Sequence, residues 1–231
     1  LRIERYMRFH AGIVSNFNPK HVNFINEYAK EYFDDYFKRF NVHDPSRGWG
    51  CRMMVNLIKN NNYFGTDPNT RLFEKLEEAK ELITSHNKRI VADLKCQGSE
   101  IFIPEWENKM DYSFTSPPYF DLEIYSTEET QSINKRGTGQ EGYKNWLDFF
   151  VKPTIDNIHR YVIDGGFVGV NIKNYNKYSL YDDWFKTFEN HGGFEFVEEL
   201  ELDWKNKVKN YVNDGESTYN EKIMIFKVKK T

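Results

Sequence analysis

Helical and extended patterns alternate along most of this 231-residue chain. From Pro19 to residue 38, apolar and aromatic side chains recur three and four residues apart, which predicts an amphipathic helix that begins at a proline. Further helices are predicted at 51–59, 70–87, 143–161 and 180–190, and strands at 40–43, 63–66, 90–94, 111–114 and 166–172. Strands that alternate with helices favour a mainly parallel sheet with right-handed crossovers.

The last part of the chain has a different pattern. Residues 194–204 and 222–229 alternate strongly between apolar and polar side chains, as the two strands of an antiparallel pair do. Gly192 and Gly193 are expected to end the preceding helix, and Pro153 to kink or break the helix at 143–161. The predicted fold is α/β and Rossmann-like: a seven-stranded, mainly parallel sheet with an antiparallel last strand and helices on both faces.

Length and composition suit one domain over residues 1–231. Hydrophobic residues make up only 39% of the chain, but aromatic residues reach 17%, so a core rich in aromatic rings is expected. No apolar run approaches the length of a membrane span and no secretory signal opens the chain, so we expect an intracellular protein, in the cytoplasm or a host cell's cytoplasm, that is not secreted. Because the chain begins at Leu1, a processed or excised form is expected.

Cysteines, histidines and charge exclude several kinds of site. Cys51 and Cys96 lack Cys-x-x-Cys spacing and are predicted to be free thiols in a reducing compartment. The six histidines are scattered without metal-ligand spacing, so no metal is expected. A net charge of −3 argues against a protein that coats nucleic acid, but it allows a local basic patch at 134–137 or 205–209, each of which could also be a solvated loop.

Unusual turns follow the predicted strands. Asp44–Gly50 contains two glycines that would let the backbone approach a ligand, and it leads into a helix whose first N–H groups attract negative charge. Asp67 lies about twenty residues after Asp44, where a carboxylate commonly accepts hydrogen bonds from a ribose diol. The alternatives are an ordinary strand-to-helix turn and a helix cap by Asp67 or Asn69. Together the two turns favour a cofactor that carries adenosine.

Two later turns add polar groups. Residues 97–100, after the third strand, offer amides and hydroxyls that could bind the edge of an adenine, although Ser99 could simply cap a turn. Thr115–Tyr119 reads Thr-Ser-Pro-Pro-Tyr, and its two prolines fix a rigid, extended turn with free carbonyl groups. Ser116 and a carbonyl could hold an exocyclic amine while Tyr119 stacks on its ring; the alternative is a plain Pro-Pro turn.

The order of these segments resembles that of the S-adenosylmethionine-dependent DNA methyltransferases that modify amino groups. Asp44–Gly50 is similar to their cofactor loop, 65–69 to their ribose-contacting turn and Thr115–Tyr119 to their catalytic motif, here in its Ser-Pro-Pro-Tyr form. The segment 14–19 is similar to the part that folds over the methionine half of the cofactor, so residues 1–38 are expected to close over it.

The resemblance implies roles for individual residues. S-adenosylmethionine would be the cofactor, and its methyl group would pass directly to an amine on a base swung out of the duplex. Serine at position 116 favours cytosine-N4 over adenine-N6 as the target. The implied catalytic residues are Ser116, Pro117, Pro118 and Tyr119. The implied cofactor-binding residues are Phe17, Asn18, Asp44, Ser46, Gly48, Gly50, Asp67, Pro68, Gln97, Gly98 and Ser99. The implied substrate-binding residues are Phe120, Lys135 and Arg136.

The chain departs from that family in one respect. No separate target-recognition domain is evident, because only the loops 123–146 and 205–221 are long enough to contribute to recognition. DNA is the expected partner, together with a partner chain or an additional recognition domain. The alternatives are a methyltransferase for RNA or a protein glutamine, and a silent cofactor-binding subunit.

Overall fold

The computed structural model describes residues 17–121, 131–132, 136–174, 178–202 and 221–230. Lys135, the basic segment 205–209, residues 123–130 and 133–135 of the loop 123–146 and nearly all of the connection 205–221 lie outside the described residues, as does the segment 14–16.

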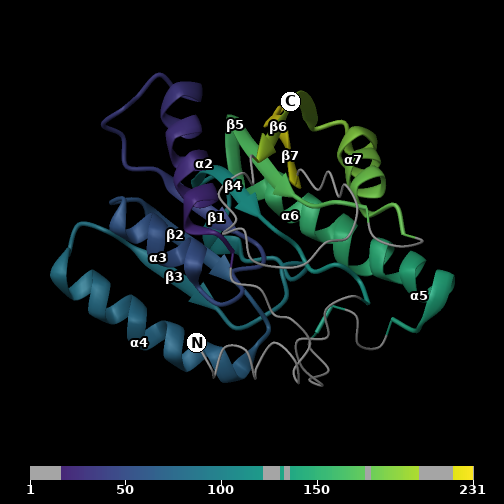
Figure 1. Cartoon of the computed structure of the whole chain (residues 1–231), viewed down its shortest axis with the longest axis horizontal. Helices are drawn as coiled ribbons and strands as arrows, with labels where there is room; N and C mark the ends of the chain where they lie inside the picture. Colours follow the sequence, from purple (N-terminus) through teal and green to yellow (C-terminus); the bar gives the residue numbers. More distant parts are fainter. Residues whose placement is uncertain (1–16, 122–130, 133–135, 175–177, 203–220, 231) are drawn as a thin grey trace, which may run out of the picture.

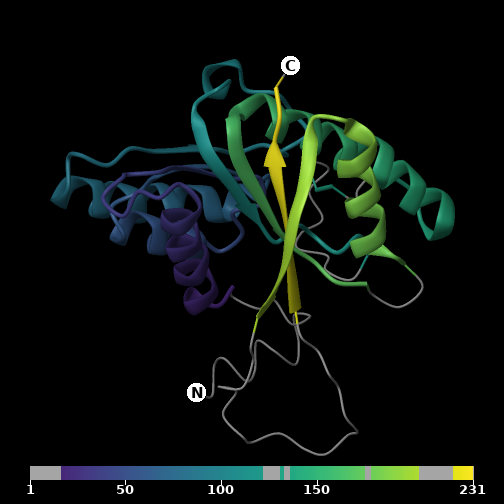
Figure 2. The same cartoon turned by 90° about the horizontal axis from the view of Figure 1, so that it is seen from above.

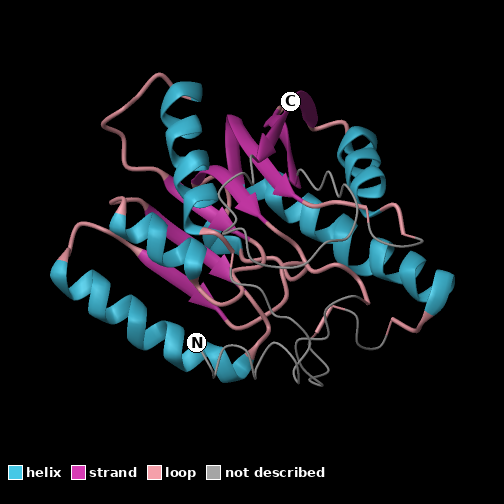
Figure 3. Ribbon diagram, viewed as in Figure 1, coloured by secondary structure: helices cyan, strands magenta, loops and turns pink. Residues whose placement is uncertain are grey.

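Helices and strands alternate as the sequence predicts (Figure 3). The helices are α2 (Pro19–Tyr32), α3 (Cys51–Ile58), α4 (Thr70–His86), α5 (Gly139–Trp146), α6 (Lys152–Tyr161) and α7 (Leu180–His191). The strands are β1 (Asn41–Asp44), β2 (Asn62–Thr66), β3 (Ala92–Lys95), β4 (Met110–Thr115), β5 (Val162–Asn171), β6 (Phe194–Leu202) and β7 (Glu221–Val228).

The strands form one seven-stranded sheet in the order β3-β2-β1-β4-β5-β7-β6. Neighbours from β3 to β5 pair in parallel, whereas β7 runs antiparallel between β5 and β6. Figure 2 shows the long strands β6 and β7 together at the end of the sheet that lies next to α7. The predicted fold class is confirmed, with an antiparallel β7 inserted beside β5.

Helices cover both faces of the sheet (Figure 1). On one face, α2 packs over β1, β4, β5 and β7, while α3 and α4 pack over β2 and β3. On the other face, α5, α6 and α7 enclose the largest core cluster with β4, β5 and β7. This cluster contains many aromatic rings, including Trp106, Trp146 and Trp184, which are each 1% exposed or less. The expectation of an aromatic core is therefore confirmed.

Helix α2 begins where the sequence predicts and ends earlier. Pro19 occupies its first turn, and Asn18 caps it by accepting a hydrogen bond from the Lys20 N–H at 3.0 Å. The predicted end at residue 38 is wrong. Asp35 accepts hydrogen bonds from the backbone N–H groups of Phe37 and Lys38, so a side chain replaces helical carbonyls as their partner.

The helix predicted at 143–161 is divided in the way that Pro153 suggests. It begins earlier, at Gly139, and a π-helical turn over Leu147–Val151 separates α5 from α6. Pro153 lies in the first turn of α6, directly after the π-helical turn. The wider turn lets the chain pass the proline without ending the helix.

His43, in β1, is expected to make the stability of the protein depend on pH. Its ring is 1% exposed, its Nδ1 lies 3.0 Å from Ser113 Oγ, and it packs against Trp106 and Tyr161. Burial lowers the pKa of His43 from 6.5 to about 4. Between these values the unfolded chain binds a proton that the folded chain does not, so stability falls as the pH falls. His43 is expected to remove about 3 kcal/mol of stability by pH 4.

Urea unfolding at pH values from 7 to 4 measures this loss of stability, with His43→Gln as the matched variant. The glutamine amide can still face Ser113 but does not titrate. The stability deficit of the variant should shrink as the pH falls, because only the wild-type chain carries the histidine penalty. Parallel pH dependences of the two chains would contradict the prediction.

Candidate functional site

The four unusual turns lie at one edge of the sheet. The strand register places Asp44 beside Gly65, His43 beside Ser113, and Thr66 beside Lys95. Because β1, β2, β3 and β4 are parallel neighbours, the segments that follow them leave the sheet side by side. The loop 44–50 therefore lies between the turn at Asp67 and the turn at Ser116, and Gln97 follows β3 beyond Asp67 (Figure 1).

Asp44 is fully buried and its oxygens are already occupied by protein donors. It accepts hydrogen bonds from the Ser46 N–H at 3.1 Å, from Arg52 Nε at 2.7 Å and from the Tyr63 hydroxyl at 2.5 Å. Arg52 also donates to the Ser46 carbonyl. Asp44 thus stabilises the loop 44–50 through these hydrogen bonds, and a ligand would contact the loop backbone instead of this carboxylate.

The amino end of α3 leaves its backbone donors open toward the same edge. Gly50 is the N-cap residue, with φ 83°, and no side chain caps the helix among the described residues. Gly48 also has a positive φ, 53°. Glycine adopts these values without strain, and the first N–H groups of a helix have no intrahelical acceptor. This end of α3 can therefore hold a negatively charged group.

Asp67 is tied to the loop and keeps acceptor capacity. Its Oδ2 accepts from the Gly48 N–H at 3.0 Å and its Oδ1 from the Asn69 N–H at 2.9 Å. Asn69 caps α4 by accepting from the Leu72 N–H at 3.3 Å, so between the two capping alternatives the structure selects Asn69. Each Asp67 oxygen has one further lone pair, which a hydroxyl group can use. Pro68 belongs to the same turn.

The turn after β3 is anchored to α6. The Ser99 hydroxyl lies 2.8 Å from Thr154 Oγ1, and Asn157 donates to the Ser99 carbonyl at 2.9 Å. Ser99 is only 4% exposed, which makes it an anchor of the turn. Gln97 donates its side-chain amide to the Ile101 carbonyl at 3.0 Å, and its side-chain oxygen remains an acceptor. Gly98 leaves room for the Glu100 carboxylate, which a Cβ at position 98 would meet.

The Ser-Pro-Pro-Tyr turn follows a fully buried strand, β4. Ser116 is partly buried, whereas Tyr119 is 9% exposed and its hydroxyl accepts a hydrogen bond from the Lys173 N–H at 3.1 Å. Phe120 has a φ of 40°, a left-handed value that is uncommon for a bulky residue. The chain after β5 thus fixes the orientation of the Tyr119 ring.

Phe120, predicted to line the substrate pocket, lies in the core instead. It is 1% exposed, and its ring lies 5.3 Å from that of Tyr143 and 5.1 Å from that of Tyr178. The ring therefore anchors the turn from behind, and its burial compensates for the cost of the left-handed backbone.

The remaining predicted residues lie around this edge. The Phe17 ring lies 5.6 Å from that of Phe114, and the Arg52 guanidinium lies 5.0 Å above it, so the start of the described chain reaches the end of β4. Asn18 uses its side chain as the cap of α2. Arg136 donates to the Phe149 carbonyl at 3.2 Å and lies 4.0 Å from the Glu100 carboxylate.

Sequence reasoning did not identify Arg52 and Tyr63 as parts of this site. Their signal was indirect: a carboxylate buried after a central strand needs a cation or several donors, and Arg52 is the first cation beyond the loop glycines.

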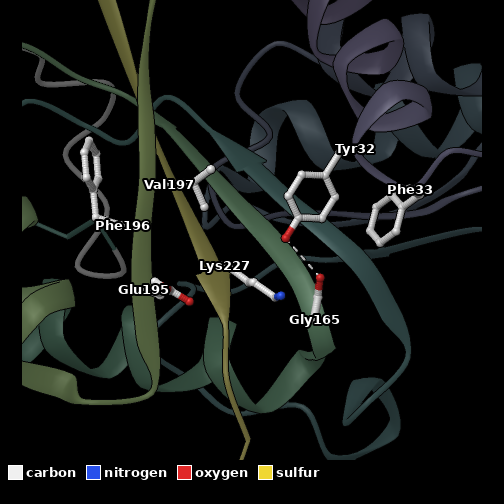
Figure 4. Close-up of a pocket in the computed structure, with 7 residues that line it drawn as sticks. All are labelled: Tyr32, Phe33, Gly165, Glu195, Phe196, Val197 and Lys227. Atoms are coloured by element: carbon white, nitrogen blue, oxygen red, sulfur yellow. Dashed lines mark hydrogen bonds between the residues drawn. The ribbon is translucent and has the colours of Figure 1, made fainter.

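An open groove of about 670 Å³ lies elsewhere (Figure 4). Its lining residues come from the carboxyl end of α2, the amino-terminal halves of β5 and β6, and β7: Tyr32, Phe33, Gly165, Glu195, Phe196, Val197 and Lys227. Since none of the predicted site residues lines it, the groove is separate from the candidate site. Across the described residues, no cluster of histidine, cysteine and acidic side chains could hold a metal ion, and no helix is both long and apolar enough to cross a membrane.

Comparisons with known proteins address the fold. No protein-family model matches the chain, and no curated protein matches it. Among solved structures, a S-adenosylmethionine-dependent methyltransferase from Clostridium acetobutylicum aligns with a TM-score of 0.59 at 14% identity, over 99% of this chain and 98% of that one. A S-adenosylmethionine-dependent O-methyltransferase from Thermotoga maritima aligns at 0.55 and 13% identity, over 97% and 71%. A tRNA (m1A58) methyltransferase from Aquifex aeolicus aligns at 0.55 and 13%, over 95% and 72%.

The fold is that of the S-adenosylmethionine-dependent methyltransferases. One of these proteins is named as a tRNA methyltransferase and another as an O-methyltransferase, and the identities are low. The fold alone therefore does not identify the acceptor, and the argument for one depends on the residues of this chain.

Proposed function

We propose that this protein binds S-adenosylmethionine and transfers its methyl group to the exocyclic amine of a DNA base, with cytosine-N4 favoured over adenine-N6. One observation carries the proposal. The Ser-Pro-Pro-Tyr turn follows β4 directly beside β1, whose carboxyl end carries the glycine-containing loop. This arrangement brings an acceptor pair for an amine next to the loop expected to hold the methyl donor.

Residues around the edge fit each part of the cofactor. The uncapped amino end of α3 suits the methionine carboxylate, with Phe17 nearby, and Asp67 suits the ribose hydroxyls. Gln97 and Gly98 border the space for the adenine. The bound cofactor supplies an electrophilic methyl group on a sulfonium sulfur.

Ser116 and the Pro117 carbonyl would orient the target amine. Two N–H bonds to these oxygens turn the nitrogen lone pair out of the ring's π system and toward the methyl group. The nitrogen held by these two oxygens would take up the methyl group that the cofactor supplies and would release one proton to solvent. Positioning supplies most of the rate enhancement in such a transfer. No covalent cysteine intermediate is required, so Cys51 and Cys96 have no part in it.

Tyr119 would provide a surface for a base that has left the duplex. The ring is 9% exposed and packs in the largest core cluster, with its hydroxyl held by the Lys173 N–H, so stacking would use only the exposed part of the ring. With a net charge of −3, DNA binding is expected to need a partner chain or an additional recognition domain. Among the rival acceptors, an RNA base or a protein glutamine would present the same kind of amine to Ser116.

The test is to incubate the protein with DNA and methyl-labelled S-adenosylmethionine, digest the DNA to nucleosides and weigh them. We expect labelled N4-methylcytosine, with incorporation that falls steeply as salt rises, because phosphate contacts compete with counterions. Asp67→Asn is the matched variant and should transfer less methyl label to DNA, because it binds the cofactor more weakly. Label in RNA or in protein, with none in DNA, would reassign the acceptor. Failure of the wild-type chain to bind the cofactor in calorimetry would defeat the proposal entirely.

A further inference from the structure

The guanidinium of Arg47 is a buried cation to which the described residues offer no hydrogen-bond acceptor. The residue is 1% exposed, and none of its three guanidinium nitrogens has an acceptor among the described residues. Its guanidinium carbon lies 5.3 Å from the centre of the Phe73 ring, in the first turn of α4. A buried charge of this kind destabilises the folded protein unless it interacts with an opposite charge nearby.

The backbone places Arg47 against the turn that carries Asp67. The Arg47 N–H donates to the Thr66 carbonyl at 3.0 Å, and the next N–H, of Gly48, donates to Asp67 Oδ2 at 3.0 Å. The Arg47 side chain also passes close to β2, since a Cβ built on Gly65 would lie 3.3 Å from the Arg47 Cβ. The Arg47 Cβ therefore lies against β2 and its guanidinium against α4, the two elements that the Asp67 turn connects.

Other charges near Asp67 cannot replace Arg47. Asp44, in the facing loop, is negative and is paired with Arg52. Lys95, at the end of β3, pairs with Asp93 at 3.1 Å. Arg71, in the first turn of α4, is exposed, and water screens an exposed charge.

We propose that Arg47 is a positioning residue that keeps Asp67 ionised, so that both Asp67 oxygens can accept hydrogen bonds from ribose hydroxyls. This role rests on the proposed function, in which Asp67 holds the ribose. A protonated Asp67 would give up one acceptor site and compete as a donor. Burial raises the pKa of Asp67, whereas Arg47 and the N–H groups of Asn69 and Gly48 oppose that rise. As the pH falls, a larger fraction of Asp67 takes up a proton and loses its charge.

Carboxyl carbon NMR tests the charge effect without any cofactor. Asp67→Asn identifies the Asp67 signal in the titration of the wild-type chain. In Arg47→Met the Asp67 pKa should rise by about one pH unit, the low end of the effect of a nearby opposite charge. Phe73→Leu is the matched control, because it disturbs the same packing and keeps the charge. An unchanged Asp67 pKa in Arg47→Met, or equal pKa changes in Arg47→Met and Phe73→Leu, would overturn the proposal.

Calorimetry with S-adenosylhomocysteine then tests the consequence for binding. Between pH 8 and pH 6, Arg47→Met should lose affinity by a larger factor than the wild-type chain, up to about tenfold larger, because its Asp67 takes up a proton at a higher pH. Phe73→Leu should lose affinity by the same factor as the wild-type chain. Parallel pH profiles for Arg47→Met and the wild-type chain would refute the role of Arg47. If the wild-type chain bound no S-adenosylhomocysteine at either pH, the proposed function would fail, while the NMR result would still decide whether Arg47 controls Asp67.

Discussion

Ser116→Ala is expected to lower turnover by about a hundredfold, comparable to the loss of one hydrogen-bonding group that acts on a transition state. The alanine removes one of the two acceptors proposed to orient the amine, while the prolines keep the turn in place. Cofactor affinity should stay within about threefold, since Ser116 is proposed to contact the acceptor and not the cofactor. Single-turnover rates with labelled cofactor, together with calorimetry, separate these two quantities.

Thr115→Val is the matched control for Ser116→Ala. Thr115 is fully buried at the end of β4, and its hydroxyl has no hydrogen-bonding partner among the described residues. Valine removes that hydroxyl at nearly the same shape, so the folded state should be as stable or slightly more stable. Turnover should change little. Equal losses of turnover in the two variants, or a loss of cofactor affinity in Ser116→Ala that matches its loss of turnover, would remove Ser116 from the proposed role.

The sequence predicted the order of the elements and the edge of the sheet at which the four unusual turns gather. These follow from local information, namely side-chain periodicity and the turns after each strand, because parallel strands bring their carboxyl ends together. Asn18 and Pro19 marked the start of α2, and Gly192, with φ 76°, marked the end of α7. The end of α2 was harder to locate, because the turn at Asp35 depends on one side chain that competes with the helix.

The contacts that distinguish a ligand-facing residue from a buried one could not be derived from the sequence. Tyr119 meets the Lys173 backbone and Phe120 meets Tyr178, and both partners lie more than fifty residues away in the chain. Phe120 was therefore predicted at the pocket because of its place beside the motif. Asp44 was predicted to meet the cofactor for the same reason, whereas the structure surrounds it with donors from α3 and β2.

Arg52→Leu is expected to destabilise the protein by about 3–5 kcal/mol, the usual effect of removing one partner from a buried ion pair. Arg52 is 5% exposed and Asp44 is fully buried, and Arg52 Nε lies 2.7 Å from Asp44 Oδ2. Without the guanidinium, Asp44 would keep only the donors of Ser46 and Tyr63. Arg52 also holds the Ser46 carbonyl and lies against Phe17, so the cofactor loop should loosen and cofactor affinity should fall as well.

Urea unfolding at pH 7 measures the loss of stability, with Tyr63→Phe as the control. That variant removes one donor to Asp44 and leaves the ion pair, so a smaller loss of about 1–2 kcal/mol is expected. Asp44→Asn combined with Arg52→Leu should recover part of the stability lost in Arg52→Leu, because no buried charge is then left unpaired. Two outcomes would contradict the prediction: Arg52→Leu loses no more stability than Tyr63→Phe, or the double variant is less stable than Arg52→Leu. In either case the ion pair between Asp44 and Arg52 would not be what stabilises the loop 44–50.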